Sequence, residues 1–220
     1  MGKFKIPYQL ILLITVPVLI VSLSLAATFR MPDVYNFYFN DSQVTNLLYT
    51  EYTNSEIADV IADFMGSFNP EEFQIYEDTG YDMQGIFSDE DSSNMLNLKK
   101  IVDFSTVMAV LSFIGTAIVY YLYLKKDDKY TLRKTYRMTL PISIVLGVIQ
   151  AGAFKIQALR HGWFGWIGWQ ELPDNSCLQA ILGDGFWSMF AVFLAAITAV
   201  VLGVLTYVNY RLTKPPRIFF

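Results

Sequence analysis

The sequence predicts an all-α integral membrane protein with four transmembrane helices and a small helical extracytoplasmic segment between the first and second helices. Of its 220 residues, 54% are hydrophobic and only 16% are charged, which is too apolar for an ordinary soluble domain. Four apolar runs are each long enough to cross a bilayer. Acidic and basic residues lie in different segments between these runs, so the protein is expected to present two distinct faces.

The first apolar run covers residues 8–29. Its 22 residues reach about 30 Å at the helical rise of about 1.5 Å per residue. Lys3 and Lys5 precede the run, and Ser24 and Ala26 form a small-residue pattern near its end. That pattern makes a cleaved signal peptide the alternative interpretation. The run is long for a signal peptide, which favours a retained helix.

The segment 31–102 is polar enough to leave the bilayer, with fourteen Asp or Glu residues and no Lys or Arg over residues 31–98. Thr53 and Glu56 have the spacing of a capping box, which predicts a helix start. Apolar residues then recur at helical spacing, namely Ile57, Val60, Ile61, Phe64, Met65 and Phe68. We expect this amphipathic helix to end near 66–70 and to lay its apolar face on the segment's own core or on the membrane surface.

A second helix start is expected at Ser88, because the acidic residues 89–91 suit the first turn of a helix. Four apolar residues beyond it share one helix face, namely Met95, Leu98, Ile101 and Val102. This helix is therefore predicted to run straight into the second span.

The remaining spans are expected at 104–124, 138–159 and 185–207. The loop 125–137 contains six basic and two acidic residues. By the positive-inside rule, this loop and both termini lie in the cytoplasm. The acidic segment and the loop 160–184 then lie on the extracytoplasmic face. The chain accordingly divides into an N-terminal transmembrane helix (1–30), an acidic extracytoplasmic segment (31–102) and a three-span membrane domain (103–220).

The stretch 157–187 carries the only histidine, the only cysteine and all four tryptophans. His161 is the first candidate for proton transfer, because imidazole titrates near neutral pH. The alternative is a hydrogen-bonded residue at the membrane interface. The aromatic residues nearby form either an interfacial belt or a pocket for an acyl chain or lipid glycerol, and they are Trp163, Phe164, Trp166, Trp169, Phe186 and Trp187.

Cys177 follows His161 in the same stretch and admits a thiolate–imidazole pair. Its neighbours Leu178 and Ile181 favour burial instead. One cysteine excludes an intramolecular disulfide, and one histidine with one cysteine is too few for a zinc or haem site without carboxylates, so no metal is expected. The sequence shows no phosphate-binding loop, dinucleotide fingerprint or nucleophile elbow. The acidic outer segment argues against a nucleic-acid partner.

A resemblance to a known family rests on the four spans, the outer segment that ends in a helix, and the aromatic-histidine stretch after the third span. That stretch reads His161-Gly162-Trp163-Phe164, followed by Trp169, Asp174, Phe186 and Trp187. The whole chain resembles the small integral membrane family that includes the lipoprotein intramolecular transacylases of low-GC Gram-positive bacteria. In that family a signature similar to HMxDV lies on the helix entering the second span. Here the sequence reads Asn94-Met95-Leu96-Asn97-Leu98, so asparagine replaces both the histidine and the aspartate.

The resemblance implies an acyl shift at the outer face of a bacterial plasma membrane. The sn-2 acyl chain of a diacylglyceryl-cysteine lipoprotein moves to the amine of the same cysteine, with membrane lipid and diacylated lipoprotein as partners and no cofactor. On this interpretation His161 transfers the proton and Asn94 donates to the oxyanion. The substrate-binding residues implied are Trp163, Phe164, Trp169 and Asn97.

Three alternatives remain open at this point. Asn94 and Asn97 are either part of the site or helix residues that face the outer water. The chain is either a catalyst or a degenerate relative that binds lipid, lipoprotein or a partner protein without turnover. A sensor role is weaker, because the loop 125–137 is too short to be an output domain.

Overall fold

A computed structural model describes residues 8–42, 51–67, 72–78, 83–170, 172–173 and 176–214. Four residues on which sequence predictions rest lie outside these ranges, namely Lys3, Lys5, Phe68 and Asp174.

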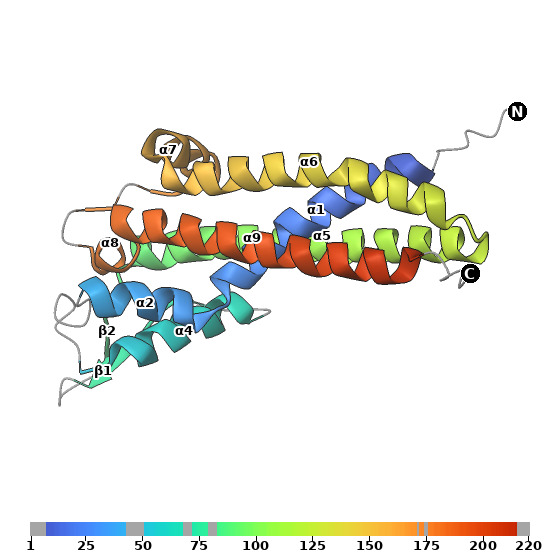
Figure 1. Cartoon of the computed structure of the whole chain (residues 1–220). Helices are drawn as coiled ribbons and strands as arrows, with labels where there is room; N and C mark the ends of the chain where they lie inside the picture. The colour runs from blue at the N-terminus through green and yellow to red at the C-terminus, as the bar shows by residue number, and fades with distance from the viewer. Residues whose placement is uncertain are drawn as a thin grey trace, which may run out of the picture. The chain divides into compact units, whose positions relative to one another are not determined.

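Four helices dominate the described chain (Figure 1). They are α1 (Tyr8–Phe29), α5 (Asp89–Lys125), α6 (Lys129–Lys155) and α9 (Asp184–Thr213). Each is long and apolar enough to cross a membrane. The predicted fold class with four spans is therefore confirmed. The first helix has the predicted bounds, and α5 runs unbroken from the predicted start into the second span.

The third span ends earlier than predicted, because α6 stops at Lys155. Ile156 is extended, and a new helix, α7 (Gln157–Trp166), begins after it. The described part of the stretch predicted as a loop over 160–184 is thus mostly helical, since it also contains α8 (Cys177–Ile181). His161 lies on a helix.

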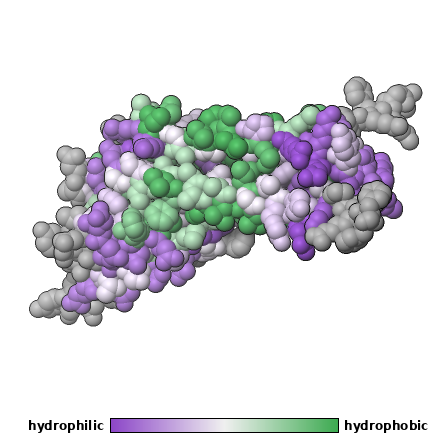
Figure 2. Space-filling view, viewed as in Figure 1, coloured by the Kyte–Doolittle hydropathy of each residue, from purple (hydrophilic) through white to green (hydrophobic). Residues whose placement is uncertain are grey.

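The chain folds into two compact units. Unit 1 contains the described residues up to Ser24, Ser105–Gln150, and those from Ala195 onward. Buried apolar side chains join three of its helix segments, those of α1, α5 and α6, and they are Leu12, Val16, Ile20, Val119, Tyr123, Leu132 and Tyr136. Helix α9 packs against this cluster through the partly buried Val201, Leu202 and Leu205. Figure 2 shows hydrophobic surface over α6 and α9 and hydrophilic residues where α5 and α6 connect, as expected of helices that meet lipid along their sides and water at their ends.

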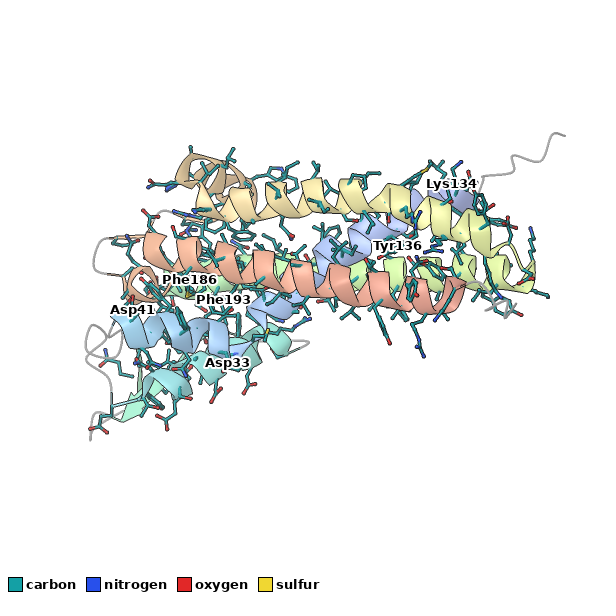
Figure 3. All side chains as sticks on the ribbon, in the orientation of Figure 1. Asp33, Asp41, Lys134, Tyr136, Phe186 and Phe193 are labelled. Carbon is teal, nitrogen blue, oxygen red and sulfur yellow. The ribbon has the colours of Figure 1, made fainter. Side chains whose placement is uncertain are left out.

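Polar pairs join the helices inside unit 1. The Thr116 hydroxyl donates to that of Thr15 at 3.0 Å, and the Tyr120 hydroxyl donates to Asn209 Oδ1 at 2.9 Å. Tyr136 Oη lies 3.0 Å from Thr206 Oγ1. In Figure 3 Tyr136 accordingly points from α6 toward α9. These pairs satisfy polar groups that would be costly to leave unpaired in hydrocarbon.

Unit 2 contains Leu25–Phe104 and Ala151–Leu194. Besides the helix ends it holds α2 (Pro32–Ser42), α4 (Asn54–Gly66), α7 and α8. Two short antiparallel strands, β1 (Tyr76–Asp78) and β2 (Met83–Gly85), pair Tyr76 with Gly85. Neither α2 nor this ladder was predicted.

Helix α4 begins as predicted at the capping box. The side chain of Thr53 accepts from the backbone N–H of Glu56, and the carboxylate of Glu56 accepts from the backbone N–H of Thr53 at 2.8 Å. Most of the predicted apolar face is buried, since Ile57, Ile61 and Met65 are at most 1% exposed. The face therefore packs on the core of its own unit.

Helix α5 also begins as predicted. The backbone N–H of Asp91 donates to Ser88 Oγ at 3.1 Å, and the backbone N–H of Ser88 donates back to Asp91 Oδ2 at 3.3 Å. One turn later Met95, Leu98 and Val102 are fully buried. The first part of α5 thereby packs into the core of unit 2.

Candidate functional site

The site is built on helix α7. Arg160 and Phe164 lie one turn apart on this helix, and both are buried. Gly168 ends the helical run with a φ of +81°, a left-handed conformation that glycine adopts without steric cost. This turn lets the backbone N–H of Trp169 donate to the carbonyl of Phe164 at 3.0 Å. The chain is thereby bent so that Trp169 faces the helix it has just left.

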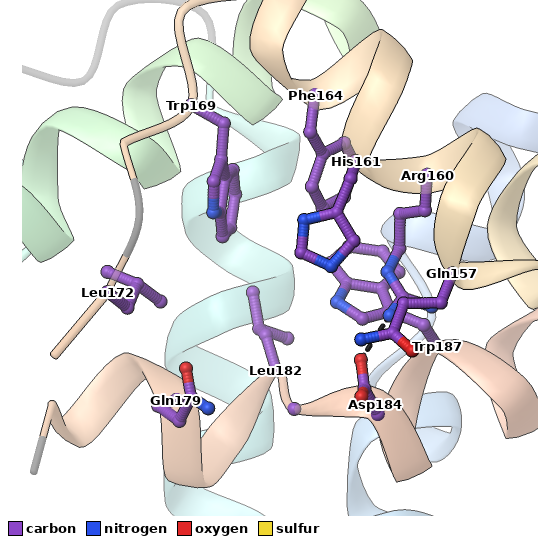
Figure 4. Close-up of a pocket in the computed structure, with 11 residues that line it drawn as sticks. Gln157, Arg160, His161, Phe164, Trp169, Leu172, Gln179, Leu182, Asp184 and Trp187 are labelled. Carbon is purple, nitrogen blue, oxygen red and sulfur yellow. Dashed lines mark hydrogen bonds and ion pairs between the residues drawn. The ribbon is translucent and has the colours of Figure 1, made fainter. Parts of the chain in front are cut away.

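A pocket of about 250 Å³ opens beside α7 (Figure 4). Helix α7 contributes one side of it, Trp169 and Leu172 a second, and the α8–α9 connection a third. The lining residues are Gln157, Arg160, His161, Phe164, Trp169, Leu172, Gln179, Leu182, Gly183, Asp184 and Trp187. A cavity of this size admits a few polar reacting groups but not a whole lipid.

Aromatic rings form much of the pocket wall. Phe164 stacks on Trp169 with ring centroids 4.7 Å apart, and it meets Trp187 edge to face at 5.0 Å. Trp163 is predicted to bind substrate, but it is not among the lining residues. Its indole N–H donates to the carbonyl of Ala153 at 3.1 Å, while Trp166 is 89% exposed. Trp169 and Trp187 therefore line the pocket, Trp163 packs against the end of α6, and Trp166 lies on the surface.

A buried arginine supplies the positive charge of the pocket. Arg160 is only 3% exposed, forms an ion pair with Asp184 and donates to the carbonyl of Phe154 at 3.0 Å. Burial lowers the pKa of its guanidinium, and the carboxylate of Asp184 opposes that shift. Because an arginine keeps its proton even so, the wall of the pocket carries a guanidinium that is paired with the carboxylate of Asp184, which also lines the pocket. Asp184 opens helix α9, where a carboxylate is also favoured by the helix dipole.

His161 follows Arg160 directly and lines the same pocket. In Figure 4 its ring projects into the space between Trp169 and Gln157. The residue is exposed, and none of the described residues hydrogen-bonds to its imidazole. The ring therefore keeps both nitrogens available to a ligand. It is the only imidazole in the chain, and of the residues predicted for the site, Phe164 and Trp169 share the pocket with it.

Asn94 and Asn97 hold the turn that carries Trp169. Asn94 is fully buried, so it does not face the outer water as one alternative had it. Its Nδ2 donates to the carbonyl of Gln170 at 3.0 Å, and its Oδ1 accepts from the backbone N–H of Gln170 at 2.7 Å. Asn97 Nδ2 donates to the carbonyl of Gly168 at 3.0 Å. Neither asparagine is among the residues that line the pocket.

Cys177 begins helix α8 and is not among the lining residues either. Burial raises the pKa of its thiol, and the nearby carboxylate of Asp91 adds to the shift. A raised pKa keeps the sulfur protonated near neutral pH, which disfavours a nucleophilic thiolate. Among the described residues, no group of three His, Cys, Asp or Glu side chains converges as metal ligands.

Sequence reasoning missed Arg160, Asp184 and Gln157. One signal was available for the first of these, because Lys155 and Arg160 are the only basic residues between Arg137 and Arg211. A cation in a segment assigned to the outer face departs from the positive-inside pattern. A nearby acidic residue would be expected to pair with it.

Neither a protein-family model nor a curated relative matches the sequence. Solved structures do match. The membrane-integral lipoprotein intramolecular transacylase Lit from Bacillus cereus aligns with a TM-score of 0.65 at 13% identity, over 93% of this chain and 95% of that one. A histidine-to-arginine variant of the same enzyme aligns with a TM-score of 0.69 at 15% identity, over 94% of this chain and 91% of that one. The chain therefore has the fold of the membrane-integral lipoprotein intramolecular transacylase Lit, across essentially its whole length.

Proposed function

We propose that the protein is a membrane acyltransferase that moves the sn-2 acyl chain of a diacylglyceryl-cysteine lipoprotein to the N-terminal amine of that cysteine. The observation that carries the proposal is the unpartnered imidazole of His161 in a pocket that also holds the guanidinium of Arg160. The shared fold supports the substrate class, because the similar structures are those of a lipoprotein transacylase.

The reaction is an isomerisation, so it needs neither a cofactor nor a co-substrate. The amine nitrogen attacks the ester carbonyl carbon, the C–N bond forms, and the bond from that carbon to the glycerol oxygen breaks. One proton leaves the amine and one reaches the glycerol oxygen. Because both reacting groups belong to one molecule, holding them together supplies much of the rate enhancement as effective molarity.

His161 is proposed to carry that proton. An amine with a pKa of about 8 is partly protonated at neutral pH, so it needs a base before it can attack. The imidazole takes the proton and then delivers it to the leaving oxygen, a role worth about 10² to 10⁴ in rate. Its exposed position in the pocket leaves room for both transfers.

We assign stabilisation of the oxyanion to the charge of Arg160 and a positioning role to Asn94. Arg160 lines the pocket one position before His161, and a fixed cation beside a developing negative charge is an effective stabiliser. The amide of Asn94 is already paired on both its oxygen and its nitrogen with Gln170. This geometry favours Asn94 as the residue that holds Trp169 in the pocket wall over a direct donor. Phe164 and Trp169 would contact the substrate.

The test is expression in a strain whose lipoproteins carry only the diacyl form, followed by mass spectrometry of their N-terminal lipopeptides. The wild type is expected to produce the N-acylated lyso form, and His161→Ala should abolish it at equal membrane abundance. Lys155→Gln is the matched control, because Lys155 is exposed and is not among the residues that line the pocket. Full conversion by His161→Ala would remove His161 from the mechanism.

A second candidate is binding of lipid or lipoprotein without turnover. The observation that favours it is the pair Asn94 and Asn97, which stand where the family pattern has a histidine and an aspartate and whose amides hold a turn. On this account the wild type leaves lipopeptides unchanged while it retains them in a pull-down. Asn94→His would then gain activity. A wild type that converts lipopeptides would exclude this candidate.

The orientation in the membrane is part of the proposal. We place the termini and the loop 125–137 in the cytoplasm and the His161 pocket on the extracytoplasmic side of the bacterial plasma membrane. The support is the charge pattern, with six basic residues in that loop and none over residues 31–98.

A further inference from the structure

Unit 1 contains a groove that the proposed acyl transfer does not use. It has a volume of about 360 Å³ and is walled by α1, α5, α6 and α9. Val16, Phe113, Ala117, Leu205 and Val208 are among its apolar lining residues. All four helices are long and apolar enough to span a membrane, so the groove is surrounded by hydrocarbon when the protein is in a bilayer.

Four polar side chains line this groove, and three of them are already hydrogen-bonded, while the fourth is the exposed Tyr121. The hydroxyls of Thr116 and Tyr120 donate to Thr15 and Asn209, and Tyr136 pairs with Thr206. These three hydroxyl groups therefore need no hydrogen bond from a ligand, and the rest of the lining is mainly apolar. A hydrocarbon chain fits such a lining, whereas a polar ligand would lose its own hydrogen bonds there.

One end of the groove reaches a cluster of cations. Leu124 and Leu212 line it next to the ends of α5 and α9. Lys125 lies four residues after the lining residue Tyr121, and Arg211 lies three residues after the lining residue Val208. Residues three or four positions apart share a helix face. Both cations therefore stand at the mouth of the groove.

These two cations are available to an anion. Both are exposed, and none of the described residues forms an ion pair with either. The guanidinium carbon of Arg211 lies 6.0 Å from the centroid of the Tyr207 ring, and this contact limits the directions in which the arginine side chain can point. Hydrophilic surface gathers at this end of α5 and α6 in Figure 2. Basic residues at the polar end of an apolar groove match a lipid that carries a phosphate on an acyl-chain scaffold.

We infer that this groove is a binding site for an anionic glycerophospholipid, with one acyl chain in the groove and the headgroup phosphate held by Lys125 and Arg211. The site lies entirely in unit 1, while the His161 pocket lies entirely in unit 2. The inference therefore stands whether or not the proposed acyl transfer is correct.

The experiment is native mass spectrometry of the full-length protein in mild detergent, titrated with phosphatidylglycerol or with phosphatidylcholine of the same acyl chains. Phosphatidylglycerol should bind at least fivefold more tightly, since one cation near the headgroup is worth about fivefold in affinity. Lys125→Gln combined with Arg211→Gln should remove that preference. Ala117→Trp should fill the groove and weaken both lipids, and because Ala117 is exposed the substitution is compatible with folding.

Lys134→Gln is the matched control. It removes one charge from the same end of the helices, but in Figure 3 Lys134 and the groove-lining Tyr136 lie on different sides of α6. The control should keep the preference for phosphatidylglycerol. Equal binding of the two lipids would overturn the inference, as would an equal loss in Lys134→Gln. Full competition by soluble glycerol phosphate would show that the acyl chain is not recognised and would also overturn it.

Discussion

The role of Asn94 gives the sharpest test of the site geometry, through the pair of variants Asn94→Ala and Asn97→Ala. Asn94 makes two hydrogen bonds to the turn and Asn97 makes one. A typical hydrogen bond contributes about 1 kcal/mol net. Gln170 is exposed, so its freed backbone groups regain water and add little further penalty. Asn94→Ala should therefore weaken the turn by about 2 kcal/mol and Asn97→Ala by about 1 kcal/mol.

These energies set limits on the loss of activity. A loss of about 2 kcal/mol in holding Trp169 corresponds to at most about 30-fold, and about 1 kcal/mol to at most about fivefold. A direct oxyanion donor is instead worth about 10² to 10³ in rate. The assay is the initial rate of lipopeptide conversion, measured together with the midpoint of thermal unfolding in detergent. A graded pair of modest losses supports positioning. A loss above 100-fold in Asn94→Ala with no loss in Asn97→Ala would refute it.

Three further outcomes follow from the same contacts. In chemical denaturation, Arg160→Gln should lower the free energy of unfolding by about 1 to 3 kcal/mol, because charged hydrogen bonds to Asp184 and a backbone carbonyl are lost. Asp184→Asn should lower it less in the same measurement. The raised pKa of the Cys177 thiol predicts that it reacts with iodoacetamide at pH 8 more slowly than the cysteine of a Glu90→Cys variant, since Glu90 is exposed. Equal reaction rates would contradict the assigned burial of Cys177. In a Cys177→Ser background, an impermeant maleimide added to intact cells should label Glu90→Cys but not Lys134→Cys, and the reverse pattern would invert the proposed orientation.

Short-range sequence patterns correctly predicted the parts of the fold that are determined by residues close together in the sequence. The first span, the capping box at Thr53 and the start of α5 at Ser88 all lie where short-range patterns predict them. Each depends on hydrogen bonds or apolar spacing within a few residues. Helix α7 was missed because Gly162 and Gly165 lower its intrinsic helix propensity. Its helical state is explained by the burial of Arg160 and Phe164.

The site itself required contacts that no local pattern contains. Asn94 and its partner Gln170 are 76 residues apart, and Arg160 and Asp184 are 24 apart. The sequence indicated that His161 and the tryptophans gather in one stretch, but not which rings face the pocket. That division depends on the left-handed turn at Gly168, which directs Trp169 toward Phe164. Because glycine adopts positive and negative φ with similar ease, the direction of the chain after Gly168 cannot be predicted from the sequence.

The most direct test of the central claim is the fragment spectrum of N-terminal lipopeptides from diacyl-only cells that express the wild type. Acyl migration leaves the mass of the lipopeptide unchanged, so the fragment spectrum must show where the acyl group sits. We predict fragments with one acyl chain on the amine and one on the glycerol in the wild type, and fragments with both chains on the glycerol in His161→Ala. Wild-type fragments with both chains on the glycerol, at confirmed membrane expression, would contradict the proposed acyl transfer.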